Sequence, residues 1–140
     1  MFNFTKYLTV SLIPFLNSCG IMKDQYDIVS KNVGSQNLRE VSIFYGGNDF
    51  GGGNVNSNTE AHYSFAHEEL PIPNKARAEW IRVKDGKRFE KILKVKPLLP
   101  KGQFKGKLIF LFDDDDVSFT WKTWEEWYNT SSHPRSRQSH

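Results

Sequence analysis

The sequence predicts a single-domain all-β protein, an antiparallel β-sandwich or small barrel with one short C-terminal helix. Its 140 residues leave room for one domain. From Leu38 onward, apolar residues alternate with polar ones, as in half-buried strands, and no long segment has a helical period. Short polar turns separate the alternating segments. Hydrophobic residues make up 38% of the chain and include eleven Phe and four Trp, which is enough material for a core.

Six segments carry the strand pattern. They are residues 41–45, 62–65, 77–84, 89–95, 108–112 and 117–121. Asp85-Gly86 lies between the third and fourth and is typical of a hairpin turn, because both residue types tolerate positive φ. The fifth segment is continuously apolar, which predicts a strand covered on both faces. Trp80 and Trp121, in the third and sixth segments, are expected in the core.

A short helix is predicted after the last strand. Thr123-Trp124-Glu125-Glu126 has the spacing of a capping box, in which the Thr and the second Glu satisfy free N–H groups of the first helical turn. We expect Trp124, Trp127 and Tyr128 to pack back onto the sheet. The β domain is therefore predicted over residues 38–130, and the polar residues 131–140 are expected to be disordered.

Residues 1–18 have the layout of an export signal. Lys6 is their single cation, an apolar segment follows at residues 7–16, and no acidic residue is present. A membrane-spanning helix needs roughly 20 apolar residues, and Pro14 would interrupt a helix here. The sequence therefore predicts a signal peptide over residues 1–18.

The signal ends at a candidate lipid-attachment site. Leu16-Asn17-Ser18-Cys19-Gly20 resembles the lipobox of bacterial lipoproteins, with a branched apolar residue three positions before the cysteine and a small residue just before it. The resemblance implies cleavage before Cys19, diacylation of its sulfur and acylation of the new amino terminus. Cys19 is the only cysteine of the chain, and the alternative is a small residue beside an ordinary cleavage site.

Residues 19–37 are predicted to be the lipid anchor and a tether, with a short strand possible around residues 26–29. Several acyl chains, at about 0.8 kcal/mol for each buried CH₂, hold a protein at a membrane essentially permanently. We therefore expect a domain in the periplasm, anchored in the bacterial cell envelope. Gly20 replaces the Asp that retains many lipoproteins at the inner membrane, which favours the outer membrane.

The charge pattern and the motifs argue against several classes of function. The net charge is +3 and basic residues are interleaved with acidic ones, so no nucleic-acid partner is expected. The glycines at 46–47 and 51–53 are not followed by the Lys-Ser/Thr of a phosphate-binding loop.

His62 and His67 are five positions apart, which places them on opposite faces of a strand, so no metal is expected. Without a nucleophile elbow either, the sequence predicts no cofactor and no enzymatic activity.

A first candidate contact for a protein partner is the segment 46–58, which is rich in Gly and Asn. It is interpreted as a conformable loop on the rigid sheet scaffold. Its candidate binding residues are Tyr45, Asn48, Asp49 and Phe50. Phe50 would be an aromatic anchor, so Phe50→Ala is expected to raise the dissociation rate and to leave folding unchanged.

A second candidate contact is the acidic turn formed by Asp113, Asp114, Asp115 and Asp116. The run lacks the alternate ligands, glycine and distal Glu of a calcium loop. An acidic turn can steer a basic partner and raise the association rate. Replacing Asp114 and Asp115 by Asn is therefore expected to slow association at low salt without affecting folding.

The order of several short motifs resembles a known family. In chain order they are Tyr45-Gly46-Gly47, Gly51-Gly52-Gly53, Leu70-Pro71-Ile72-Pro73, Trp80, Asp85-Gly86-Lys87, Phe104-Lys105-Gly106 and Trp121. This order is similar to that of short proteobacterial lipoproteins of uncharacterised domain type, which are often encoded beside type VI secretion phospholipase effectors. The resemblance implies an immunity protein that neutralises such an effector in the periplasm.

These observations predict a periplasm-facing lipoprotein that binds and neutralises a toxic effector, with a secreted phospholipase as the implied target. Two alternatives remain open. The first is an inhibitor of a lysozyme or another hydrolase. The second is an envelope lipoprotein that binds a sugar, a lipid or a metal through aromatic side chains such as Trp80 or Trp124.

Overall fold

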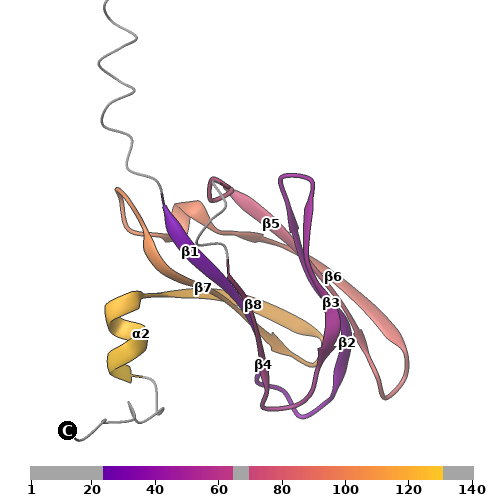
Figure 1. Cartoon of the computed structure of the whole chain (residues 1–140). Coiled ribbons are helices and arrows are strands. Elements are labelled where there is room, and N and C mark those ends of the chain that lie inside the picture. The colour runs from indigo at the N-terminus through magenta and orange to yellow at the C-terminus, as the bar shows by residue number, and fades with distance from the viewer. Residues whose placement is uncertain (1–23, 65–69, 131–140) are drawn as a thin grey trace, which may run out of the picture.

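The protein is a β-sandwich of two four-stranded sheets with one short helix at the C-terminal side, as the sequence predicts (Figure 1). The computed structural model describes residues 24–64 and 70–130. The predicted signal peptide, the first five residues of the predicted tether (19–23) and the predicted disordered tail lie outside the described residues. Within them, no helix is long and apolar enough to cross a membrane.

The first sheet has the strand order β4-β1-β7-β8. Its strands are β1 (Gln25–Asn32), β4 (Glu60–Ser64), β7 (Lys105–Asp113) and β8 (Asp116–Thr123). β1 runs parallel to β7, so this one pair departs from the antiparallel prediction, while β1–β4 and β7–β8 are antiparallel. Nearly every residue of β7 between Gly106 and Phe112 is buried, which confirms that this strand is covered on both faces.

The second sheet has the order β3-β2-β5-β6 and is antiparallel throughout. Its strands are β2 (Leu38–Tyr45), β3 (Asn48–Val55), β5 (Lys75–Arg82) and β6 (Lys87–Lys94). The predicted hairpin between β5 and β6 is confirmed. Its connection spans residues 83–86, and Gly86 takes φ 68°, the left-handed conformation that favours glycine.

The domain begins earlier than the sequence predicts. β1 falls within the predicted tether, yet it lies between β4 and β7 in the interior of a sheet. Tyr26, Ile28 and Val29 are at most 2% exposed. The sequence suggests only a short strand around residues 26–29, because the buried residues of β1 fall on both faces and the strict alternation of a half-buried strand is missing.

The Gly-rich segment after Tyr45 is also a strand and not a long loop. β3 pairs with β2 along its length, with register shifts around Val41. Gly51 has φ 141°, and a Cβ at this position would lie 2.1 Å from the carbonyl oxygen of Val41. Position 51 therefore requires a glycine, because the backbones of β2 and β3 approach each other closely at this register shift.

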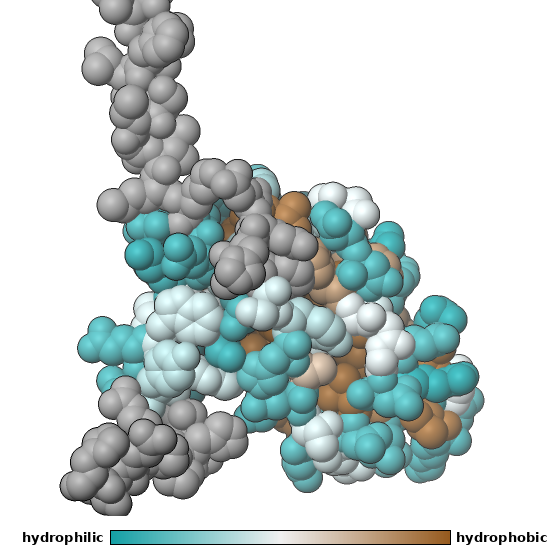
Figure 2. Space-filling view, viewed as in Figure 1, coloured by the Kyte–Doolittle hydropathy of each residue, from teal (hydrophilic) through white to brown (hydrophobic). Residues whose placement is uncertain are grey.

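The core lies between the two sheets, while hydrophilic residues cover most of the face shown in Figure 2. Trp80 is its largest fully buried side chain. The ring of Trp80 stacks on Phe89 at 5.5 Å and meets Phe112 edge-on at 5.3 Å. The hydroxyl groups of Tyr26 and Tyr45, from opposite sheets, are hydrogen-bonded at 2.6 Å, so each buried polar tip is satisfied.

Helix α2 (Trp124–Thr130) has the predicted capping box. Glu126 N donates to Thr123 Oγ1 at 3.2 Å, and Thr123 Oγ1 donates to Glu126 Oε1 at 2.9 Å. Trp124 and Trp127 are half-buried against the first sheet, but Tyr128 is 57% exposed, so the prediction for Tyr128 is wrong. Tyr128 stacks on Trp124 at 6.4 Å instead.

The two ends of the sandwich carry different connections (Figure 1). At the entry end, the described chain starts at Asp24. The β2–β3 turn, η2 (Lys96–Leu98) and the start of β7 lie at this same end. The far end holds the β1–β2 and β3–β4 connections and the β5–β6 and β7–β8 turns. The candidate binding residues lie at one of these two ends or on the outer face of the first sheet, beneath α2.

Candidate protein-binding surface

The two predicted binding segments lie at opposite ends of the sandwich. The acidic turn contacts the β1–β2 connection, because Gln36 N donates to Asp114 Oδ1 at 3.1 Å. The β2–β3 turn lies at the other end of β2, whose eight residues span roughly 25 Å. A single binding surface made from both segments is therefore ruled out, and each must be considered separately.

The β2–β3 hairpin buries its aromatic residues. Phe50 is 6% exposed and Tyr45 is 8% exposed, with their ring centroids 4.7 Å apart. The assignment of Phe50 as an exposed anchor is wrong, because β3 pairs with β2 and directs the ring into the core. Asn48 donates from Nδ2 to Gly46 O within the turn, and Asp49 is exposed. An open hollow of about 450 Å³ beside them is lined by Phe44, Tyr45, Gly47, Asn48, Asp49 and Arg77.

Phe50→Ala is therefore expected to destabilise the domain, by about 3 kcal/mol, since it removes a buried aromatic ring. Urea denaturation of the chain from residue 20 measures the change. Asp49→Ala, at the neighbouring exposed position, is the control and should stay within about 0.5 kcal/mol of the parent. A parent-like midpoint for Phe50→Ala would place the ring outside the core.

At the far end, Asp114 fixes the acidic turn to the rest of the domain. Asp114 has φ 51°, a conformation that Asp tolerates better than most residues. Its carboxylate accepts hydrogen bonds from Gln36 N at 3.1 Å and from Ser35 Oγ at 3.5 Å. Its carbonyl accepts the Nε1–H of Trp80 at 2.9 Å. A Cβ at residue 34 would lie 2.7 Å from Asp114 Oδ1, so Gly34 permits this close approach.

The carboxylates of Asp113 and Asp115 remain exposed on either side of this anchor. Asp116, the next residue, is bonded to Lys91 Nζ at 2.7 Å, and this hydrogen bond lowers the pKa of Asp116. The turn therefore presents a rigid pair of acidic side chains, because it is bonded to the β1–β2 connection, to Trp80 of β5 and to Lys91 of β6. Asp113 and Asp115 can contact a partner, whereas Asp114 is committed to the fold.

A polar hollow of about 290 Å³ adjoins the acidic turn. It is lined by Gln36, Arg82, Lys84, Asp85 and Asp114. Arg82 donates from both Nε and Nη2 to Asp85, at 3.1 and 2.7 Å, and the side-chain hydrogen bond from Arg82 lowers the pKa of Asp85 to about 2. Two-point pairing of this kind fixes orientation, so the β5–β6 turn is ordered beside the acidic turn.

Asp114→Ala and Asp115→Ala are expected to behave differently, although they are neighbours with the same charge. Asp114→Ala removes the acceptor of Gln36 N and should lower the free energy of unfolding by about 1–2 kcal/mol. Asp115→Ala should stay within about 0.5 kcal/mol of the parent. Urea denaturation of both variants checks this difference, and equal losses would contradict the role given to Asp114. The sequence-based expectation that a change at Asp114 leaves folding unaffected is therefore wrong, because its carboxylate is hydrogen-bonded to the β1–β2 connection.

A third arrangement, on the outer face of the first sheet, is not evident from the sequence. Lys107 is 8% exposed, and its Nζ lies 4.3 Å from the ring centroid of Trp127 and 5.7 Å from that of Trp124. The same Nζ is 3.1 Å from His62 Nδ1 and 3.8 Å from Asp27 Oδ2. The cation–π contacts hold α2 on the sheet. The trace that it leaves in the sequence is Lys107, directly before the apolar residues 108–112, together with Trp124 and Trp127 of the C-terminal helix.

His62 is occupied by this network, because its Nε2 also lies 3.1 Å from Glu60 Oε1. The second histidine of the segment, His67, lies outside the described residues. Among residues 24–64 and 70–130, no three His, Cys, Asp or Glu side chains are grouped to hold a metal ion. Trp80, at 1% exposure, is inaccessible to a small ligand, so its assignment as a ligand-binding aromatic is wrong.

No family model matches this sequence, and the comparisons with curated proteins and with solved structures gave no match either.

Proposed function

We propose that this chain is a lipid-anchored envelope protein whose β-sandwich binds and neutralises a toxic effector in the periplasm. The observation that carries the proposal is the placement of the rigid acidic turn relative to the candidate lipid anchor. Asp24 follows Cys19 by five residues and lies at the entry end. Asp113 and Asp115 lie at the opposite end. If Cys19 is anchored in the membrane, this opposite end is free to face the periplasm.

A rigid, charged turn suits an inhibitor. Because the backbone around Asp114 is already fixed, binding does not require the turn to become ordered, and this lowers the entropic cost of association. Asp113 and Asp115 attract a basic surface on the partner and raise the association rate, an effect that salt weakens. The neighbouring Arg82–Asp85 pair and Lys84 add polar groups that can select one partner. A secreted phospholipase is the target class that the family resemblance implies.

Competition between bacterial strains tests this function even while the effector is unidentified. A strain that lacks the gene for this chain is grown in contact with its parent, which acts as the attacker. The proposal predicts that the mutant loses viability, that the wild-type gene restores it, and that the doubly substituted Asp113→Asn/Asp115→Asn gene restores it incompletely. An attacker with a disabled secretion apparatus is the control. Equal survival of mutant and parent beside the active attacker would contradict the proposal.

A further inference from the structure

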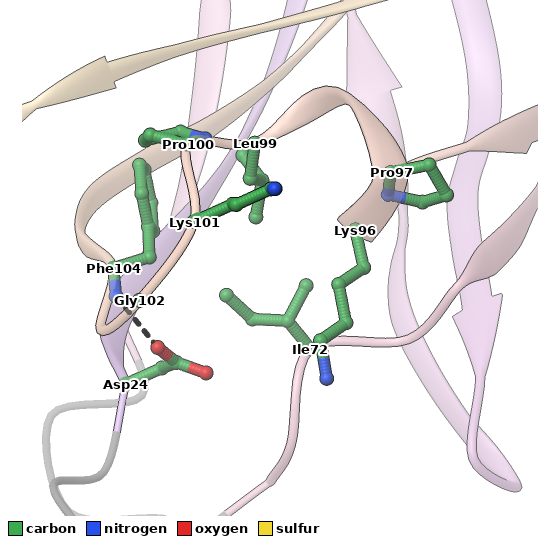
Figure 3. A pocket seen from close by; sticks show the side chains of 9 residues that line it. All are labelled: Asp24, Ile72, Lys96, Pro97, Leu99, Pro100, Lys101, Gly102 and Phe104. Carbon is green, nitrogen blue, oxygen red and sulfur yellow. Dashed lines mark hydrogen bonds between the residues drawn. The ribbon is translucent and has the colours of Figure 1, made fainter.

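The entry end carries a hollow of about 390 Å³ beside the point where the described chain begins (Figure 3). Its lining residues are Asp24, Ile72, Lys96, Pro97, Leu99, Pro100, Lys101, Gly102 and Phe104. Phe104 N donates to Asp24 Oδ1 at 2.7 Å, which ties the first described residue to the wall of the hollow. Trp121 Nε1 donates to Leu98 O at 3.0 Å and holds the η2 turn against β8. The hollow is therefore a fixed part of the fold.

This end combines apolar and basic side chains. Leu98, in the same turn as the lining residue Pro97, is 53% exposed. Five exposed lysines lie at the same end of the sandwich. Lys96 and Lys101 line the hollow, Lys75 is paired with Lys94 where β5 begins and β6 ends, and Lys105 is paired with Gln25 where β7 and β1 begin. Asp24 and Asp49 lie at this end too, and Asp24 is already bonded to Phe104 N. An exposed leucine on the same end as several exposed lysines matches the interface of an anionic membrane, where the apolar group enters and the cations meet lipid headgroups.

The length of chain before the hollow places it near the proposed anchor. Asp24 is five positions after Cys19, and five residues of fully extended chain span at most roughly 18 Å. The polar headgroup region is itself about 5–7 Å thick on each side of the hydrocarbon. A bilayer that holds the acyl chains of Cys19 is therefore within reach of the hollow and its lysines.

We propose that the entry end, with Leu98 and the lysines around the hollow, docks on the surface of the anionic bilayer that holds the lipid anchor. This proposal rests on the lipid attachment at Cys19 that is part of the proposed function. Docking at the entry end turns the far end away from the membrane. The acidic turn is then held toward the periplasm by two attachments, the acyl chains and the docked end.

A fluorescent probe at Leu98 tests the docking. The mature, acylated Leu98→Cys protein is labelled with an environment-sensitive dye and reconstituted into vesicles of phosphatidylcholine with phosphatidylglycerol. Val83→Cys is the matched control, because Val83 is 52% exposed and lies in the β5–β6 turn of the far end. Nitroxide-labelled headgroups in the bilayer should quench the dye at 98 several-fold more strongly than the dye at 83.

Charge reversal supplies the second measurement. Lys96→Glu/Lys101→Glu in the Leu98→Cys background should lower the quenching on phosphatidylglycerol vesicles, and added salt should act in the same direction. Equal quenching at 98 and 83 in a protein that carries fatty acid would overturn the docking and leave the lipid anchor standing. A protein that carries no fatty acid would instead refute the anchor on which the docking rests.

Discussion

Trp80→Ala is expected to lower the free energy of unfolding by about 3–5 kcal/mol. The side chain is 1% exposed and is the largest in the core. Its removal leaves a cavity between Phe89 and Phe112, whose rings lie 5.5 and 5.3 Å from the indole. The change also removes the donor to Asp114 O, so the acidic turn loses one of its supports. Urea denaturation of the chain from residue 20 gives the value.

Trp121→Ala is the matched control for this prediction. The sequence predicts both tryptophans in the core and favours Trp121 through its alternation with Val117 and Phe119. The structure places Trp121 only partly inside, with its ring edge-on to Phe104 at 5.9 Å. Its loss should cost about 1–2 kcal/mol. A loss under about 1 kcal/mol for Trp80→Ala would contradict the assigned core.

The sequence is informative where one face of a strand is buried and the other is solvated. Residues 41–45 and 117–121 lie in β2 and β8, and all but the last two residues of the segment 77–84 lie in β5. The capping box is also local, because Thr123 and Glu126 are three residues apart. In these elements the chain alone specifies the local structure and the direction of each side chain.

This local signal is missing in two strands: β1, for which the sequence suggests only a short strand around residues 26–29, and β3, which it predicts as a loop. β1 is covered on both faces, so the polar side of the alternation is absent. β3 consists largely of Gly and Asn, which disfavour strands in isolation, and it is held by pairing with β2. Tertiary pairing outweighs propensity in such segments. The burial of Phe50 follows from that pairing and therefore could not be inferred from its sequence neighbours.

The candidate site shows the same limit. The sequence identifies the acidic turn, but it cannot separate Asp114 from Asp113 and Asp115. The distinction depends on the bond between Gln36 N and Asp114, whose residues are 78 positions apart. The Lys107 network likewise joins four elements of the chain, β1, β4, β7 and α2.

Cys19→Ser is expected to abolish attachment of fatty acid and to leave the precursor unprocessed. The serine hydroxyl cannot take the place of the thiol in forming the thioether, and Cys19 is the only cysteine of the chain. The loss should be complete, because no other thiol is present to accept the lipid. In strain competition, the Cys19→Ser gene should restore less viability than the wild-type gene.

Acylation of Cys19 is the claim on which the orientation, the docking and the proposed neutralisation depend together. Metabolic labelling of cells with a fatty acid, followed by purification of the wild-type and Cys19→Ser proteins, measures it directly. The wild-type protein should carry the label and start at residue 19, and the Cys19→Ser protein should carry none. Equal label on the two proteins, or no label on the wild type, would contradict the lipid anchor.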